Sequence, residues 1–464
     1  MATWLRVDDP ATGQVACEVR LLEPHEVDGA VRAAQASQSV WRDVPLDERI
    51  VLVERAIAHI VAHRERIARD ITRQMGKPIA QALAEVDTMA HRATVLCQIA
   101  PEALRTEILP APGGTIRRVV HEPVGVVVDI APWNYPLLVV VNVVVPAVLA
   151  GNAVLVKHSP RTPRCGEHFA EAFAAAGAPE GLVQAVHLDH GTAVGLLQSP
   201  GIDAVFFTGS VRGGRQVYAT VASARLVDVG LELGGKDAAY VRPDVDVAWA
   251  AAQIAEGALY NAGQSCCAIE RVYVHRAVAG PFVDALVEAV RAWRPGDPTD
   301  PATRLGPMAL PTAPAALQAQ VEQAVAQGAR VLTGGGPTQV GGQGRYFEPT
   351  VLVDVDDAMD VMQHESFGPL VPVAVVDDDD EALARIDDSA YGLTASIWTA
   401  DLERAAELAT RIDTGTVYAN RCDYLDPELP WSGRRLSGKG VTLGHHGFAP
   451  MTRLKALLLQ PPPG

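Results

Sequence analysis

The sequence predicts an α/β fold built from two successive units of parallel strands joined by crossover helices. In the first unit, short runs rich in β-branched residues at 124–130, 153–157 and 204–207 alternate with helical patterns at 164–176 and 193–198. This alternation is typical of a parallel sheet, because each helix carries the chain back to the edge where the next strand begins. With 464 residues, the chain is also long enough for two or three buried cores.

The second unit shows the same alternation between about 234 and 416. Strands are predicted at 238–241, 271–275, 329–332 and 370–376, and helices at 247–260, 281–291 and 315–327. The region before the first unit is mainly helical. Apolar residues recur at helical spacing over 27–40 and 46–75, and Gly76-Lys77-Pro78 ends the second of these helices.

Composition excludes several classes of function. The formal net charge of -16 disfavours nucleic acid as a partner, because phosphate backbones are held by clustered Lys and Arg. No uninterrupted apolar run is long enough to span a membrane, and the N-terminus lacks the pattern of a secretory signal. The six cysteines show no C-x-x-C spacing, so we expect no metal site, no disulfide framework and a cytoplasmic location.

The common phosphate-binding motifs are missing. Neither G-x-x-x-x-G-K-[ST] nor a strand-linked G-x-G-x-x-G is present. The remaining candidate is the stretch 207–214, F-T-G-S-V-R-G-G, which follows a predicted strand and opens a helical pattern. Glycines there would let backbone amides approach a pyrophosphate, although a glycine after a strand also serves as a simple turn.

Two adjacent cysteines, Cys266 and Cys267, lie in N-A-G-Q-S-C-C-A-I-E-R between a predicted helix and a predicted strand. A free cysteine in an apolar helix is usually a small core residue. A thiol on a loop at a helix-to-strand junction is different, since it can be exposed to a substrate and act as a nucleophile if a base lies nearby.

Two further segments offer groups that would assist such a thiol. Glu232, in L-E-L-G-G-K, would have a raised pKa if buried and would then exchange protons near neutral pH; a surface or helix-capping glutamate is the alternative. Asn134, in A-P-W-N-Y-P, is held between two prolines, so its amide is suited to an oxyanion; a structural Asn in a rigid turn fits equally well.

These three motifs occur in an order that resembles the aldehyde dehydrogenase superfamily, and the resemblance covers essentially the whole chain. Further matching blocks are F-T-G-S at 207–210, E-S-F-G-P at 365–369 and P-W-S-G-R-R-L-S-G-K-G at 430–440. The resemblance implies an NAD(P)-dependent dehydrogenase with a Rossmann-variant cofactor domain, an α/β catalytic domain and a small oligomerisation extension.

The resemblance also assigns catalytic roles. Cys266 is the nucleophile that forms a thiohemiacetal and then a thioester, Asn134 holds the oxyanion, and Glu232 activates the water that hydrolyses the thioester. CoA-acylating relatives generally lack a glutamate at the position of Glu232, so its presence favours hydrolysis. A CoA-acylating dehydrogenase and a non-catalytic family member are the two alternatives.

For the cofactor, the resemblance implies NAD or NADP bound by Trp133, Lys157, Ser159, Gly209, Ser210, Glu365 and Phe367. Many NAD-preferring members place a glutamate three residues after the lysine, where this chain has Pro160. With Lys157, His158, Ser159 and Arg161 around it, a 2′-phosphate would be tolerated. The segment K-H-S-P resembles some succinate-semialdehyde dehydrogenases, so NADP stays open beside NAD.

The same alignment places at the substrate mouth Tyr135, Val139, Asn142, Tyr260, Ser265, Cys267 and the loop 421–431, which includes Arg421 and Tyr424. The aromatic members suit an aliphatic or aromatic tail. Arg421 would suit a distal carboxylate, or it is a solvated loop residue or a partner of Asp423 or Asp426.

The resemblance divides the chain into segments. Residues 1–107 and 123–233 form the cofactor-binding domain, 234–418 the catalytic domain, 108–122 and 440–464 the oligomerisation segments, and 419–439 the substrate-mouth loop that returns to the cofactor domain. The apolar strand at 454–460 would be an exposed edge in a monomer, so we expect a homodimer or homotetramer.

Overall fold

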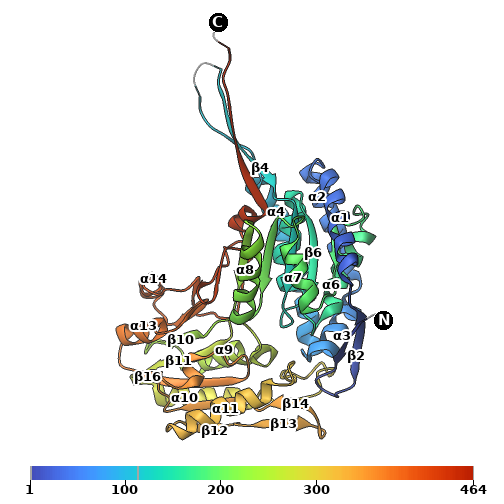
Figure 1. Cartoon of the computed structure of the whole chain (residues 1–464). Coiled ribbons are helices and arrows are strands. Elements are labelled where there is room, and N and C mark those ends of the chain that lie inside the picture. The colour runs from blue at the N-terminus through green and yellow to red at the C-terminus, as the bar shows by residue number, and fades with distance from the viewer. Residues whose placement is uncertain (1–2, 112–113, 463–464) are drawn as a thin grey trace.

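The computed structural model describes residues 3–111 and 114–462. Residues 1–2, 112–113 and 463–464, which fall within the predicted segments 1–107, 108–122 and 440–464, lie outside the described residues. Figure 1 shows two bodies, each built around a sheet, and a narrow ribbon of strands that projects from the upper body. The predicted α/β class is confirmed.

The chain begins with a hairpin and four helices. These are β1 (Trp4–Asp8), β2 (Val15–Arg20), α1 (Pro24–Trp41), α2 (Leu46–Ala62), α3 (Arg64–Met75) and α4 (Ile79–Ala103). The single helix predicted over 46–75 is wrong, because the structure breaks it at His63. The His63 amide donates to the carbonyls of both His59 and Ile60, which tightens the last turn of α2. Helix α3 then starts in a new direction and packs its apolar face on α4.

The first sheet has six strands in the order β21-β9-β8-β5-β6-β7. They are β5 (Val126–Ala131), β6 (Ala153–His158), β7 (Val183–Ala185), β8 (Ala204–Thr208), β9 (Asp228–Glu232) and β21 (Gly438–Lys439), with helices α5 (Leu138–Ala150), α6 (Pro163–Ala175), α7 (His190–Gln198) and α8 (Val211–Ala224). All neighbours are parallel except β21, which returns late in the sequence and pairs antiparallel with β9. The carboxyl ends of β5, β6, β8 and β9 therefore face the same way.

The second sheet has seven strands in the order β12-β15-β16-β11-β10-β18-β19. They are β10 (Asp237–Val241), β11 (Ile269–His275), β12 (Arg330–Thr333), β15 (Thr350–Val353), β16 (Leu370–Val376), β18 (Thr394–Trp398) and β19 (Thr416–Ala419). The helices are α9 (Val247–Leu259), α10 (Ala279–Arg291), α11 (Ala313–Ala326), α12 (Asp360–Gln363), α13 (Asp379–Asp387) and α14 (Leu402–Ala409). Only β12 runs antiparallel to its neighbour.

Short pairs complete the architecture. The projecting ribbon consists of β3 (Glu107–Ile108), β4 (Ile116–Pro123) and β22 (Thr452–Leu459), all antiparallel. Two further antiparallel pairs are β13 (Pro337–Val340) with β14 (Gln343–Phe347), and β17 (Tyr391–Gly392) with the distant β20 (Arg434–Arg435). Apolar side chains of the ribbon are exposed, including Ile108 at 76% and Leu454 at 68%.

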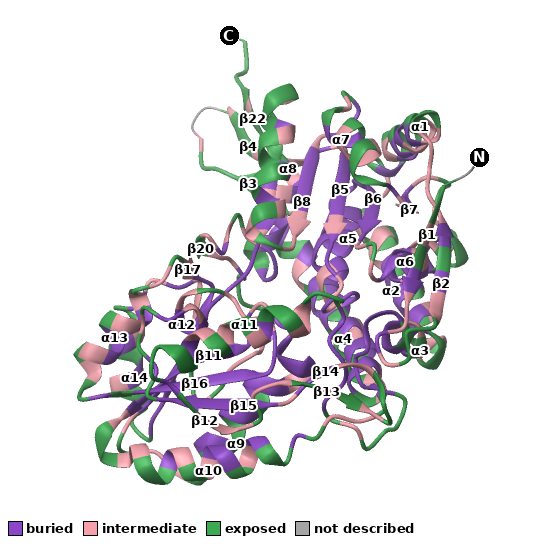
Figure 2. Cartoon of the chain, turned by 60° about the horizontal axis from the view of Figure 1, so that its bottom comes forward, coloured by how far each residue is buried: buried purple, intermediate pink, exposed green. Residues whose placement is uncertain are grey.

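Each body has its own hydrophobic core. One core draws mainly on residues between 27 and 233 and is joined by a few late residues such as Trp431 and Phe448, while the other lies between 238 and 412. Figure 2 shows buried segments running through both sheets, with exposed helix faces around them. The chain passes from one core to the other at Gly234 and Gly235, so residues around this crossing are well placed to form a shared site.

Within residues 3–111 and 114–462, no helix combines the length and apolar character that a membrane span requires. The same part of the chain contains no cluster of three or more potential metal-ligating side chains.

Candidate active site

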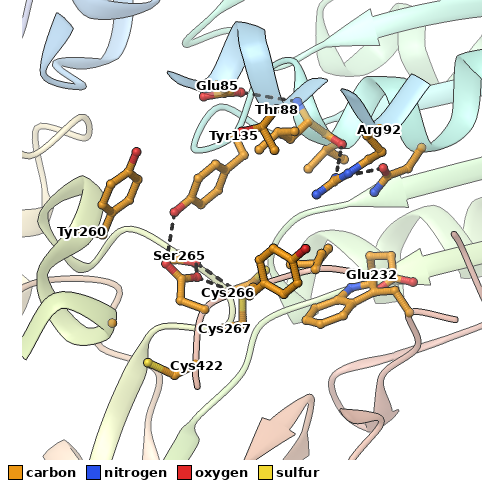
Figure 3. A pocket seen from close by; sticks show the side chains of 18 of the residues that line it. Glu85, Thr88, Arg92, Tyr135, Glu232, Tyr260, Ser265, Cys266, Cys267 and Cys422 are labelled. Carbon is orange, nitrogen blue, oxygen red and sulfur yellow. Dashed lines mark hydrogen bonds between the residues drawn. The ribbon is translucent and has the colours of Figure 1, made fainter. Parts of the chain in front are cut away.

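A cavity of about 450 Å³ lies where the two cores meet. Its walls come from α4, α5, the end of β9, the 260–267 loop and the 420–431 loop. Of the candidate residues, it is lined by Glu232, Cys266, Tyr135, Val139, Tyr260, Cys267, Arg421 and Tyr424. In Figure 3, Glu232 lies to the right of Cys266 and Cys267, and Thr88 and Arg92 lie above them.

The adjacent cysteines have different surroundings. Cys267 is buried, and its thiol donates to Asp423 Oδ1 over 3.1 Å. The neighbouring Cys266 thiol and burial hold the pKa of Cys267 well above its usual value, so this thiol stays protonated. Cys266 is half-buried on the cavity wall. The structure therefore offers Cys266, and not Cys267, as the accessible thiol.

The loop before Cys266 has an unusual backbone. Asn261, Ala262 and Gly263 all adopt positive φ angles, at 54°, 57° and 70°. Such residues persist only where surrounding contacts hold them. The Asn261 side chain donates to the carbonyls of Asn134 and Gln264, both over 3.1 Å. The loop that carries the thiol is thus tied directly to the segment that carries Asn134.

Gln264 fixes the other end of this loop. Its amide nitrogen donates to the Asn261 carbonyl over 3.0 Å, and its oxygen accepts from the Ala309 amide over 2.8 Å. The motif G-Q-S-C therefore contains a positioning residue two places before the thiol. Sequence reasoning identified the motif but gave Gln264 and Asn261 no role.

Glu232 ends β9 and points into the cavity. Its Oε2 atom is buried and has no hydrogen-bond partner among the described residues. Burial raises the pKa of this carboxyl well above 4.5, opposed only by a hydrogen bond from Trp431. A carboxyl with a raised pKa and a free oxygen facing a cavity is suited to exchange protons with water or substrate.

Asn134 lies in the bend between β5 and α5. It is buried, and its carbonyl accepts from Asn261. It is not part of the cavity wall, which begins one residue later at Tyr135. The structure thus connects Asn134 to the thiol loop through the backbone; its side-chain role stays a prediction.

Two cofactor candidates from distant segments meet near this bend. The rings of Trp133 and Phe367 pack edge to face, with centroids 5.4 Å apart. Phe367 has a positive φ of 52° and its amide donates to the buried Glu270 over 2.8 Å. Glu270 is in turn paired with Lys236 over 2.7 Å. This buried pair fixes the 365–367 segment beside the crossing between the two cores.

Glu365 rests against the glycines of that crossing. Its Oε1 accepts from the Gly235 amide over 3.1 Å, and an added Cβ at Gly234 would come within 2.4 Å of its carboxylate. Burial, followed by the charge of Glu270, raises the pKa of Glu365 to about 8. The carboxylate is therefore engaged by the L-E-L-G-G-K segment, and the close fit explains why that segment contains glycine.

Glu365→Gln should stabilise the protein at alkaline pH and change its stability little at about pH 5. The pKa of the Glu365 carboxyl is about 8 in the folded protein, above its ordinary 4.5, so the folded state binds this proton more tightly than the unfolded chain does. The resulting contribution to the free energy of unfolding is fully present below pH 4.5 and is lost as pH rises through about 8. Glutamine cannot ionise, so the variant avoids this loss, which is on the order of 5 kcal/mol at about pH 9. Urea unfolding at both pH values measures the difference, and an equal shift at both would contradict an ionisation effect.

The loop proposed for pyrophosphate opens α8. Ser210 caps the helix, accepting from the Gly213 amide over 3.2 Å, and the Gly209 amide donates to the Glu232 carbonyl over 3.0 Å. A Cβ at either Gly209 or Gly213 would lie 2.8 Å from the Phe207 ring. Bare backbone at a helix N-terminus fits a phosphate group. This loop also connects the candidate cofactor groove to the strand that carries Glu232.

Lys157 is the penultimate residue of β6, paired with Ile130 of β5. It is buried, which lowers its pKa, and it forms no ion pair within the described parts of the chain. A buried cation of this kind fits a hydroxyl-rich or anionic ligand. Ser159 follows, and its hydroxyl accepts from the Arg161 amide over 3.2 Å. Both residues lie at the carboxyl end of the sheet, as a Rossmann-type site requires.

The other two side chains expected near a 2′-phosphate, His158 and Arg161, have partners within the protein. The Arg161 guanidinium is bound to Asp8 of the N-terminal hairpin. The His158 ring contacts the Pro136 carbonyl and the Thr162 hydroxyl, and burial lowers its pKa to about 4. Neither side chain offers a free positive charge, so Lys157 is the available cation beside Pro160.

Asp423 organises the substrate side of the cavity. It accepts from Ser265 Oγ over 2.8 Å and from the Tyr135 hydroxyl over 3.4 Å, in addition to the Cys267 thiol. Arg421 forms no ion pair with Asp423 or Asp426 among the described residues, contrary to one of the expected alternatives. Its exposed guanidinium instead lies 3.6 Å over the Tyr424 ring. Arg421 is thus at the solvent side of the mouth.

Sequence reasoning missed the wall contributed by α4. Glu85, Thr88 and Arg92 recur on one face of this helix and line the cavity. The available signal was that Glu85, Thr88 and Arg92 recur at helical spacing, among other polar residues such as Asp87 and His91. A solvated helix face has the same pattern, so the sequence alone did not place them inside.

Comparison with known proteins agrees with this geometry. Residues 2–457 match the model of the aldehyde dehydrogenase family. The chain belongs to this family. Members oxidise aldehydes to acids with NAD or NADP, and that is the reaction of this aldehyde dehydrogenase; its specific substrate is not determined by the family.

Among similar proteins, succinate-semialdehyde dehydrogenase [NADP(+)] of Deinococcus radiodurans is 35% identical, over 96% of this chain and 93% of its own. Betaine aldehyde dehydrogenase 1 of Rhizobium meliloti is 36% identical, over 93% and 88%. The crystal structure of an indole-3-acetaldehyde dehydrogenase with NAD+ superposes with a TM-score of 0.95 at 30% identity, covering 98% of this chain and 93% of that one.

Proposed function

We propose that this aldehyde dehydrogenase oxidises its substrate through a covalent thioester on Cys266 and releases the acid by hydrolysis. One observation carries the proposal: the accessible thiol of Cys266 shares a cavity with the unpaired, buried Oε2 of Glu232. A nucleophile and a base that face one space are what a two-step acyl transfer needs.

The Cys266 thiolate attacks the aldehyde carbon, and the carbonyl oxygen becomes an oxyanion. The Asn134 side chain and the Cys266 amide are the proposed donors to that oxyanion. Bound NAD or NADP supplies the hydride acceptor that converts the thiohemiacetal to a thioester. Glu232 then takes a proton from water, which attacks the thioester and frees Cys266.

Seven residues are proposed to bind the cofactor, and six to form the wall around the substrate, on the basis of their placement. Trp133, Lys157, Ser159, Gly209, Ser210, Glu365 and Phe367 lie at or near the carboxyl end of the first sheet and the crossing between the cores, and Tyr135 begins the substrate wall. Val139, Tyr260, Cys267, Arg421 and Tyr424 complete that wall.

The test is an assay of NADH or NADPH formation with aliphatic, aromatic and carboxylated aldehydes, with and without CoA. We expect activity without CoA and one equivalent of free acid for each reduced cofactor. Activity that depends on CoA would favour the acylating alternative. Relatives named for succinate semialdehyde and for betaine aldehyde differ in the charge of the substrate's far end, so the panel includes both charges.

Asn134→Ala should lower kcat by about a hundredfold or more, because one oxyanion donor contributes about 3 kcal/mol to the transition state. Asn134→Asp is the matched control of equal size that cannot donate from its side chain, and it should be similarly slow. Steady-state kinetics checks both variants. A normal kcat in either would mean that the Asn134 carbonyl, which binds Asn261, is its only role.

We further propose that residues 1–107 and 123–233 are the cofactor-binding domain and 234–418 the catalytic domain, which the two separate cores support. Segments 108–122 and 440–464 contain the ribbon, and 419–439 forms the mouth loop. The exposed apolar ribbon supports a homodimer or homotetramer. A monomeric mass by light scattering would refute it. A cytoplasmic location remains a prediction from the sequence.

A further inference from the structure

Arg92 is a buried cation in the wall of the active-site cavity. It lies on α4, and only 4% of its surface is exposed. Figure 3 shows it on the same side of the cavity as Thr88 and Glu85, opposite the two cysteines. Neither the catalytic chemistry nor the proposed cofactor groove uses this residue.

Only some of the N–H donors of this guanidinium have a hydrogen-bond acceptor in the part of the chain that the structure describes. Its Nη1 donates to the Leu138 carbonyl over 2.9 Å and to Asn142 Oδ1 over 3.0 Å. Its Nε is buried and has no partner among the described residues. No carboxylate within residues 3–111 and 114–462 forms an ion pair with it. A buried charge without a counter-charge is costly, so a ligand that supplies one is favoured.

The nearest candidate counter-charge on α4 is already occupied. Glu85 is bound by the Lys77 ammonium through Oε2, and its Oε1 accepts from the Leu137 amide over 2.8 Å. Both oxygens of Glu85 therefore have other partners, and Glu85 acts on Arg92 only through its charge, without an ion pair among the described residues. Although burial lowers the pKa of Arg92 to about 10, it remains charged at neutral pH.

We propose that Arg92 binds a carboxylate at the end of the substrate remote from the aldehyde, so that this enzyme prefers semialdehydes of dicarboxylic acids. The inference rests on the proposed function of the cavity. Because Nη1 is engaged and Nε is buried, Nη2 is the donor left for a ligand, and its charge-assisted hydrogen bond to a carboxylate is strongest where water is excluded. Thr88, one helical turn before Arg92, lines the same wall and places a hydroxyl beside the expected carboxylate.

Arg421 is the competing cation. Its guanidinium is exposed and stacks on Tyr424, so solvent screens its charge. A carboxylate held there would gain little compared with one held by the buried Arg92. Carboxylate binding at Arg92 and carboxylate binding at Arg421 therefore predict different effects of substitution on the same substrates.

The experiment compares kcat/KM for succinic semialdehyde and for butanal, which have equal chain lengths. We expect the wild-type enzyme to prefer the semialdehyde. Arg92→Met, which keeps the apolar stem, should lower the ratio of the two kcat/KM values by about fiftyfold, mainly through KM for the semialdehyde. Arg92→Lys should restore part of the ratio because it keeps the charge but loses the fixed geometry of the guanidinium.

Arg421→Met tests the alternative that Arg421 binds the carboxylate. We expect it to change the ratio of the two kcat/KM values by less than about threefold. Arg105→Met, at an exposed arginine outside the cavity, controls for loss of surface charge. A wild-type ratio near one, equal losses on both substrates in Arg92→Met, or a ratio lost only in Arg421→Met would overturn the inference. Failure of the proposed function is separate: wild-type protein would then turn over neither aldehyde. Melting temperatures show whether Arg92→Met folds. If it does not, the ratio of kcat/KM values in Arg92→Lys tests the inference instead.

Discussion

Cys266→Ala should abolish aldehyde oxidation, with kcat falling by at least about a thousandfold. Alanine removes the sulfur that forms the thiohemiacetal and leaves the loop otherwise intact, because the loop is held by Asn261 and Gln264 and not by the thiol. Steady-state formation of NADH or NADPH measures the loss. Cofactor binding, followed by quenching of tryptophan fluorescence, should persist.

Cys267→Ala is the matched control, since the two residues are adjacent and lose the same atom. We expect kcat of this variant to fall by less than about tenfold, because the Cys267 thiol is protonated and donates a hydrogen bond to Asp423. Asp423 keeps its bond from Ser265. If Cys267→Ala were the inactive variant and Cys266→Ala the active one, the assignment of the nucleophile would be reversed.

Glu232→Gln should separate the two halves of the reaction. Without the base, the thioester forms but hydrolyses slowly, so a single burst of reduced cofactor precedes a steady rate about a hundredfold to a thousandfold lower. Stopped-flow absorbance measures the burst, and intact-mass spectrometry of the quenched protein should show the acyl group on Cys266. A steady rate equal to that of the wild type would assign the base elsewhere.

The same variant has a defined pH signature. Because burial raises the pKa of Glu232, the carboxylate form that accepts a proton exists only above that raised pKa. The wild-type kcat should therefore increase with pH through the raised pKa and then level off. In Glu232→Gln this step should disappear. A step retained in the variant would belong to another group, and Asp423, whose pKa burial also raises, is the next candidate.

The sequence was sufficient to predict the fold class and to identify the main candidate residues. The strands at 153–157, 204–207 and 370–376 appear within one or two residues of their predicted bounds, because β-branched runs between helices leave few alternatives. Helix 46–75 was wrong because apolar periodicity continues across His63, where only the local hydrogen bonds reveal the break.

What the sequence could not supply were contacts between distant segments. Nothing near Arg161 in the chain indicates that Asp8 would bind it, and nothing near Arg92 indicates that its helix would face Cys266 across a cavity. The difference between Cys266 and Cys267 has the same origin. It depends on Asp423, more than a hundred residues later, whose carboxylate captures one of the two thiols.

The short strand β21 has a consequence for how the enzyme matures during synthesis. It pairs Gly438 with Glu232 and Lys439 with Leu231, so β9 gains its outer neighbour only after nearly the whole chain has been made. Trp431, which lines the cavity together with Glu232, also arrives late. A nascent chain that already holds the reactive cysteine therefore lacks the surroundings that give the base its raised pKa, and the active centre is completed only when the last stretch of polypeptide closes over it.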